Sequence, residues 1–116
     1  MPNVTMYISS EAMPSGQVLE RLTERCTDLC TGVLHAALEN VHVIYVPVRA
    51  GRGHPVFAEI LFREETFRSP VVMERFMAGV DDAVQDLTGL TARIRCFAFA
   101  AQHVHARHED LRRGRG

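Results

Sequence analysis

The chain has 116 residues, of which 47% are hydrophobic and 23% are charged, and its formal net charge is -1. This composition predicts one globular domain with a sizeable core over residues 1–116. The small net charge argues against nucleic acid or an anionic membrane as a partner, and no apolar run reaches the roughly 18 residues of a membrane span. The first residues lack the layout of a signal peptide, so we expect a cytoplasmic location.

The first half, about residues 2–50, predicts a strand, a helix and a second strand. The stretch "NVTMYIS" alternates polar and apolar residues, which is the period of a half-buried strand. Apolar residues then recur at helical spacing over about residues 15–31, after a Pro-Ser entrance and before Thr31-Gly32, a typical helix stop. The stretch "VHVIYVPV" is apolar almost throughout, which is typical of a strand covered on both faces.

The same plan repeats over about residues 55–101. "VFAEILFRE" predicts a third strand, "TFRSP" a turn into a second helix, and "ARIRCFAFA" a fourth strand; Thr88-Gly89 gives the second helix stop. Two β-α-β units predict an α+β fold, with a four-stranded mixed sheet and two helices on one face. A polar tail over residues 106–116 follows the second unit.

The other face of the predicted sheet has no cover within the chain. The fourth strand presents Phe97 and Phe99 on one side and small or aliphatic residues on the other. A chain of this size cannot shield both faces of a four-stranded sheet. We therefore predict a homo-oligomer that buries the second face between subunits.

Neither the cysteines nor the histidines predict a metal site. Cys26, Cys30 and Cys96 lie within apolar patterns and are expected to be reduced core thiols. His103, His105 and His108 form the stretch "HVHARH", in which His103 and His105 alternate, but no carboxylate or thiol at ligand spacing completes a site there. No metal is therefore expected.

Proline at position 2 is followed at once by a strand, which allows two interpretations. In the first, Pro2 simply begins a strand, where its nitrogen has no proton to donate to a sheet ladder. In the second, removal of Met1 leaves Pro2 with a free secondary amine. Burial in apolar surroundings would lower the pKa of that amine and make it a base for proton transfer near the working pH.

The chain resembles the tautomerase superfamily. That superfamily includes macrophage migration inhibitory factor (MIF), 4-oxalocrotonate tautomerase, 5-carboxymethyl-2-hydroxymuconate isomerase, malonate semialdehyde decarboxylase and the 3-chloroacrylate dehalogenases. The resemblance covers about residues 2–100. It rests on the initial Met-Pro, the doubled β-α-β plan, the stretch "TGVLHAALENVHVIYV" and the double-arginine segment "LFREETFRSP". It implies a tautomerase/MIF-like fold, a homotrimer and chemistry without a cofactor.

The resemblance also implies the site residues. It makes Pro2 the catalytic residue and places the substrate carboxylate on Arg63 and Arg68, the arginines that follow the third strand. Guanidinium groups suit bidentate binding of a carboxylate. The alternative is that both are surface arginines paired with Glu64 and Glu65. The fourth strand lacks the tyrosine of the dehalogenase branch, which favours simple proton transfer over hydrolytic dehalogenation.

These features together favour a cofactor-free tautomerase or isomerase of small 2-oxo or dienol carboxylates. One alternative is a hydrolytic dehalogenase or a decarboxylase of the same superfamily. The other alternative is a trimeric binding protein without catalytic activity, in which Pro2 only starts a strand.

Overall fold

The computed structural model describes residues 2–107. Met1 lies outside the described residues, and so do residues 108–116, most of the predicted polar tail. Within this range four strands form one sheet in the order β2-β1-β3-β4. The strands are β1 (Asn3–Ser9), β2 (His42–Val48), β3 (Val56–Arg63) and β4 (Ala92–Phe99). The helices are α1 (Gly16–Gly32) and α2 (Pro70–Thr88), and three short 3-10 segments are η1 (Ser10–Ala12), η2 (Leu38–Asn40) and η3 (Ala101–His103).

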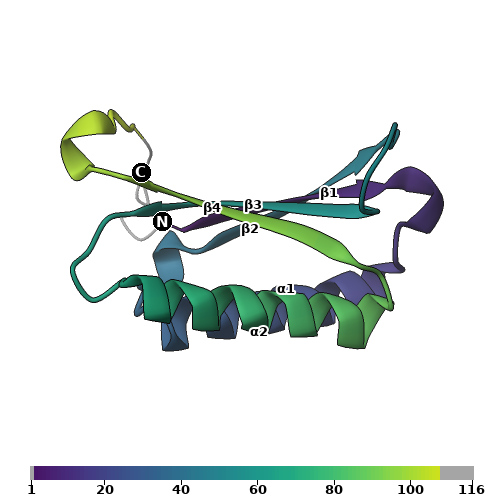
Figure 1. The fold of residues 1–116 in the computed structure, drawn as a ribbon, viewed down its shortest axis with the longest axis horizontal. Coiled ribbons are helices and arrows are strands. Elements are labelled where there is room, and N and C mark those ends of the chain that lie inside the picture. Colours follow the sequence, from purple (N-terminus) through teal and green to yellow (C-terminus); the bar gives the residue numbers. More distant parts are fainter. Residues whose placement is uncertain (1, 108–116) are drawn as a thin grey trace, which may run out of the picture.

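The sheet consists of two parallel pairs joined antiparallel at its centre. β1 runs parallel to β2 and β3 runs parallel to β4, whereas β1 and β3 are antiparallel. α1 and α2 both cover the same face of the sheet (Figure 1). The predicted α+β fold with a mixed sheet is therefore confirmed. The starts of β1 and β2 and the ends of β3 and β4 meet at one end of the sheet, which we call the Pro2 end.

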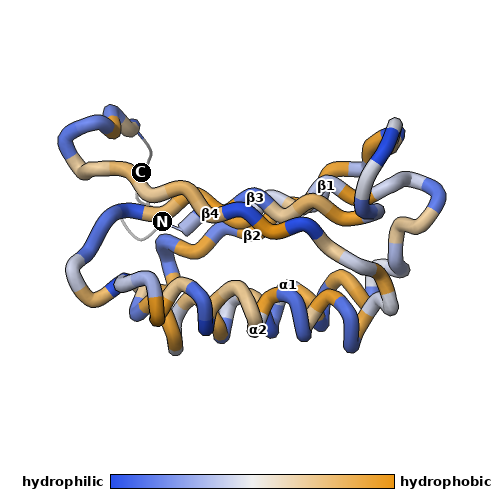
Figure 2. Tube along the Cα trace, viewed as in Figure 1, coloured by the Kyte–Doolittle hydropathy of each residue, from blue (hydrophilic) through white to orange (hydrophobic). Residues whose placement is uncertain are grey.

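The core lies between the sheet and the two helices. β1 and β3 alternate along their lengths, with every second side chain buried against the helices. Figure 2 shows the same alternation of hydrophobic and hydrophilic residues along the strands. The largest buried side chains are those of Met6, Ile8, Leu22, Leu34, Ile60 and Phe76. All of these residues except Leu34, which follows α1, are apolar members of the patterns that predicted the strands and helices.

Serine residues cap both helices at their N-termini. The hydroxyl oxygens of Ser15 and Ser69 accept hydrogen bonds from the backbone N–H groups of Val18 and Val72, each at 3.3 Å. Pro70 occupies the start of α2, where a backbone N–H would have no acceptor within the helix, so the lack of this group in proline costs no hydrogen bond. The two predicted helix entrances are thus present, and they fix where each helix begins.

The two helices end in different ways. Gly89 follows α2 in the left-handed conformation, with φ of 73°, as expected of a glycine stop. Gly32, by contrast, is the last residue of α1, and the left-handed residue of this connection is His35, with φ of 55°. The N–H of Ala36 then donates to the carbonyl of Cys30 at 3.0 Å, which folds the segment after α1 back on the helix end.

We expect Gly89→Ala to lower the free energy of unfolding by about 1–2 kcal/mol, because an L side chain is disfavoured in the left-handed region. Gly32→Ala is the matched control. Gly32 is helical, and a Cβ added there meets nothing within 4 Å, so this variant should be neutral or slightly more stable. Urea unfolding measures both effects. An equal decrease in the free energy of unfolding in the two variants would contradict this account of the helix ends.

The sheet face away from the helices is open and partly apolar. Its exposed hydrophobic side chains include Ile44 on β2, Leu61 on β3 and Phe97 on β4, which are 53%, 39% and 46% exposed. Leu61 and Phe97 are register partners and therefore lie side by side. Phe99 lies on the same side of β4 as Phe97, as the sequence predicted. This open face is the surface that the sequence assigned to a subunit contact.

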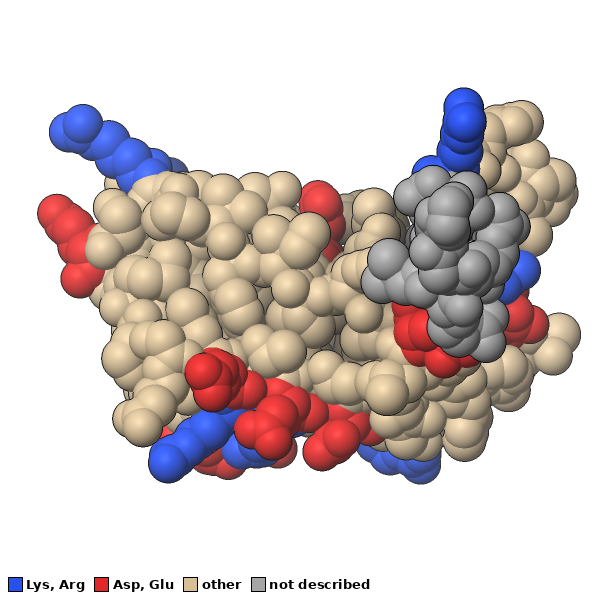
Figure 3. Space-filling model, turned by 180° about the vertical axis from the view of Figure 1, so that it is seen from behind, with Lys and Arg blue, Asp and Glu red and all other residues tan. Residues whose placement is uncertain are grey.

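The outer surface of the helical layer is charged. Figure 3 shows acidic side chains along this layer, with arginines among them. Arg25 of α1 and Asp86 of α2 form an ion pair at 3.3 Å across the two helices. Within residues 2–107, no helix combines the length and the hydrophobicity that a membrane crossing needs.

Candidate active site

Pro2 lies directly before β1 and is buried, with less than 2% of its surface exposed. It lies on the helix side of the sheet, because the alternation of β1 places every second residue there. Its carbonyl accepts a hydrogen bond from the N–H of His42 at 3.1 Å, which ties it to the start of β2. Continuing the register of β1 and β3 by one residue places Pro2 opposite the buried Phe62. The surroundings of Pro2 are therefore apolar.

Arg63 is the last residue of β3 and lies on the open side of the sheet, opposite Phe99 of β4. Its side chain is 53% exposed, and its Nε lies 3.9 Å from Oε2 of Glu65. A cavity of about 220 Å³ lies beside it, lined by Arg63, Phe99, Ala101 and Val104. This cavity therefore combines one cationic wall with apolar walls.

Arg68 lies in the turn between β3 and α2, and its guanidinium contacts main-chain oxygens. Nε and Nη2 donate to the carbonyl of Leu34 at 3.0 and 2.9 Å, and Nη1 donates to the carbonyl of Arg63 at 2.8 Å. The same guanidinium lies over the ring of Phe67, 5.2 Å from its centre. Partial burial lowers the pKa of Arg68.

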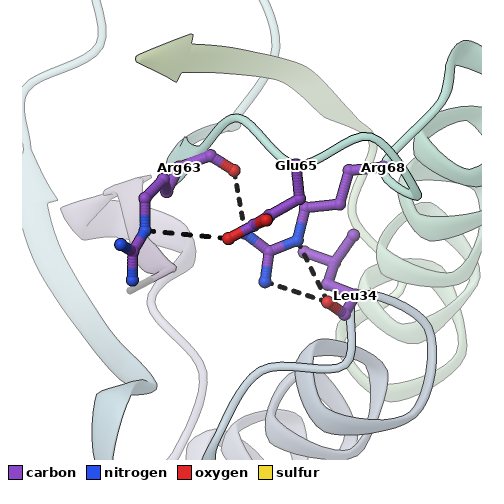
Figure 4. A network of polar contacts seen from close by, with 4 residues as sticks. All are labelled: Leu34, Arg63, Glu65 and Arg68. Carbon is purple, nitrogen blue, oxygen red and sulfur yellow. Dashed lines mark hydrogen bonds and ion pairs between the residues drawn. The ribbon is translucent and has the colours of Figure 1, made fainter. Parts of the chain in front are cut away.

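The structure brings both arginines to the Pro2 end of the sheet but not to one point. In Figure 4 the guanidinium of Arg63 points away from that of Arg68, and the carboxylate of Glu65 lies between them. Arg68 lines a second, open hollow of about 490 Å³. The other residues that line it are Phe62, Glu64, Glu65, Thr66 and Ala98. The two candidate carboxylate-binding residues therefore face different cavities.

The sequence did not indicate the contacts around Leu34. Besides the bonds from Arg68, the ring of His35 packs edge-on against Phe67, with the ring centres 5.4 Å apart. No motif predicts a hydrogen bond from an arginine side chain to a main-chain oxygen 34 residues away. The stretch "TGVLHAALENVHVIYV" contributed to the family resemblance, but it indicated no contact partner for the segment after α1.

The cysteines are free, and Cys26 and Cys30 are buried within the core. Burial raises the pKa of both thiols to about 12 and that of Cys96 to about 11. They therefore stay protonated at neutral pH, in agreement with the predicted core role. Among residues 2–107 no three histidine, cysteine or acidic side chains lie close enough together to hold a metal ion. His108 lies outside the described residues.

No family model and no curated protein matches this chain, but solved structures do. Pt0534, solved after inactivation by 2-oxo-3-pentynoate, matches with a TM-score of 0.76 and 18% identity over 90% of each chain. N1, a member of the cis-3-chloroacrylic acid dehalogenase family, has a TM-score of 0.77 and 14% identity over 90% of this chain and 79% of its own. The fused 4-OT W0, a symmetric trimer, has a TM-score of 0.74 and 16% identity over 90% of this chain and 93% of its own.

These solved structures are members of the tautomerase superfamily, so the resemblance seen in the sequence is confirmed at the level of fold. The superfamily neighbours include proteins with isomerase, dehalogenase and decarboxylase chemistry. At 14–18% identity the likeness of the three structures establishes the fold alone.

Proposed function

We propose that this protein is a cofactor-free tautomerase or isomerase of small 2-oxo or dienol carboxylates. Pro2, freed by removal of Met1, is the base that transfers the proton. The observation that carries the proposal is the burial of Pro2 at the end of the sheet where Arg63 also lies, with Pro2 on the helix side and Arg63 on the open side. Among the solved structures that share this fold, Pt0534 was inactivated by 2-oxo-3-pentynoate and N1 belongs to a dehalogenase family, which supports a catalytic function for this chain.

The chemistry follows from the surroundings of Pro2. Apolar neighbours disfavour an ammonium ion, so a free prolyl amine there is deprotonated near neutral pH. The amine takes a proton from an oxygen or carbon of the substrate, and the resulting ammonium returns it to another atom of the same molecule. Arg63 binds the carboxylate and stabilises the negative charge that develops on the conjugated oxygen. The substrate is isomerised without a metal or a cofactor.

Covalent labelling with 2-oxo-3-pentynoate tests this proposal. The free amine of Pro2 would add to the alkyne: a nitrogen–carbon bond forms, one alkyne π bond is lost, and the amine proton moves to carbon. We expect one reagent per chain, gained as its whole mass and located at Pro2 by peptide mass spectrometry. The buried thiols should not compete, because burial keeps them protonated.

A chain that retains Met1 is the control for this labelling, because the nitrogen of its Pro2 is an amide and cannot add to the reagent. Loss of activity together with a label at Pro2 is the expected result. An active enzyme that stays unlabelled at Pro2, or that is inactivated by a label elsewhere, would contradict the proposal.

We further propose a homotrimer that buries the open face of the sheet. Leu61 and Phe97 on that face support it, as does the trimer formed by the fused 4-OT. Sedimentation should give about three times the chain mass of 13.0 kDa. Phe97→Glu should weaken assembly, whereas Val71→Glu, an equally drastic change at the exposed start of α2, should not. A monomeric wild type would contradict the proposal.

A further inference from the structure

Arg68 connects two loops that are far apart in the sequence. Its bonds to the carbonyl of Leu34 reach the segment after α1, and its bond to the carbonyl of Arg63 reaches the end of β3. Its own backbone N–H donates to the carbonyl of Glu65 at 3.0 Å, which fixes the turn that carries it. Charged donors make the stronger hydrogen bonds of proteins, so both loops are firmly held.

The segment that Arg68 holds is conformationally unfavourable on its own. His35, directly after Leu34, is in the left-handed region with φ of 55°, which a residue with a side chain rarely adopts. Such a conformation persists where the surroundings impose it. Here Arg68 holds the preceding carbonyl, while the ring of Phe67 contacts both His35 and the guanidinium of Arg68. The corner at residues 34–35 and the turn at residues 67–68 are thus joined by two kinds of contact.

The charges around Arg68 disfavour a substrate carboxylate there. The hollow that Arg68 lines also has Glu64 and Glu65 in its wall, so its acidic groups outnumber its basic one. A carboxylate bound to Arg68 would have to compete with three existing hydrogen bonds. Arg63 is more available to a substrate. Its ion pair with Glu65 lies at the surface and is 3.9 Å long, and such pairs contribute little to the free energy of folding. A substrate carboxylate can therefore replace Glu65 at Arg63 at small cost.

We propose that Arg68 is a positioning residue that fixes the loops at the Pro2 end through the carbonyls of Leu34 and Arg63, and that it does not bind the substrate. This assignment replaces the carboxylate-binding role that the family resemblance implied for it. The effect on catalysis rests on the proposed function, whereas the effect on the loops does not. Arg63 depends on Arg68 because its own main chain is held there.

Hydrogen exchange tests the effect on the loops directly. Arg68→Lys keeps the charge but loses the planar set of donors that reaches two carbonyls. We expect amide exchange over residues 34–37 and 64–68 to become about tenfold faster. Arg75→Lys, at an exposed arginine of α2, is the matched control and should leave these rates unchanged. Unchanged exchange in folded Arg68→Lys would overturn the proposal.

Kinetics test the catalytic effect. The methyl ester of phenylpyruvate lacks the negative charge of the acid and is larger by one methyl group. A positioning role predicts that Arg68→Lys lowers kcat on the order of tenfold for both, with KM for the acid little changed. A loss seen only with the acid, and mainly in KM, would assign Arg68 to the substrate instead. If wild-type protein is inactive with every enol acid, the proposed function fails and the exchange result alone decides the role of Arg68.

A measurement on the wild type covers the case in which Arg68→Lys does not fold. The Nε–H signals of Arg63 and Arg68 can be followed by nitrogen-15 NMR while benzoate, an unreactive carboxylate, is added. We expect the Arg63 signal to shift and the Arg68 signal to stay in place and exchange slowly. The reverse pattern would overturn the proposal.

Discussion

Pro2→Ala is expected to lower kcat/KM by about 10²-fold, within the range that a general base contributes. The variant keeps an N-terminal amine after removal of Met1, but that amine is primary and is no longer held by a ring. The ring of Pro2 is also buried, so its loss leaves the amine free to move in the space that the ring filled. Activity should therefore fall without disappearing.

Pro14→Ala is the matched control, because Pro14 lies in the turn before α1, away from the Pro2 end. It should retain wild-type kinetics. Intact mass must confirm that Met1 is absent from both variants. The wild-type rate should decrease as the pH falls through the pKa of the amine, since the protonated form cannot accept a proton. Full activity of Pro2→Ala would contradict a catalytic role for Pro2 and would support the interpretation that Pro2 only begins a strand.

Arg63→Ala is expected to lose about 2–4 kcal/mol of transition-state stabilisation, or roughly 30- to 900-fold in kcat/KM. In the wild type, the Arg63 guanidinium binds the substrate carboxylate and stabilises the developing negative charge beside the apolar walls of its cavity. The variant loses both interactions. The fold should survive, because the side chain is 53% exposed and forms only a surface ion pair. Circular dichroism and urea unfolding check this second expectation.

Two further variants make the Arg63 experiment specific. Arg75→Ala removes an exposed arginine of α2 and should leave kcat/KM unchanged. Glu65→Gln removes the carboxylate that pairs with Arg63 and should keep KM the same or lower it, because the substrate no longer competes with Glu65. If Arg63→Ala behaves as wild type with every active substrate, Arg63 is a surface residue and the carboxylate is bound elsewhere.

The strands and helices could be predicted from the sequence because local patterns determine them. "VFAEILFRE" alternates apolar and other residues, and β3 indeed runs from Val56 to Arg63 with alternate burial. The serines before each helix also act where the sequence placed them, as hydrogen-bonded caps. Each of these features depends on residues within a few positions of one another, so a single sequence suffices to find them.

The arrangement of the arginines could not be predicted in this way. Arg63 and Arg68 are five residues apart, but a strand end and a turn separate them. The strand alternation places Arg63 on the open side of the sheet, while the turn carries Arg68 towards the carbonyl of Leu34. That partner comes from a distant loop, and its left-handed neighbour His35 is not a residue that marks such a turn as glycine does. Only the assembled fold defines these contacts.

The nitrogen-15 signal of Pro2, followed against pH in the native protein and in the same chain unfolded in urea, tests the central claim most directly. We predict an amine signal in both states, with the pKa in the native protein below that in the unfolded chain, because burial disfavours the ammonium form. An amide signal from a retained Met1, or an amine with the same pKa in both states, would contradict the account of Pro2 as the catalytic base.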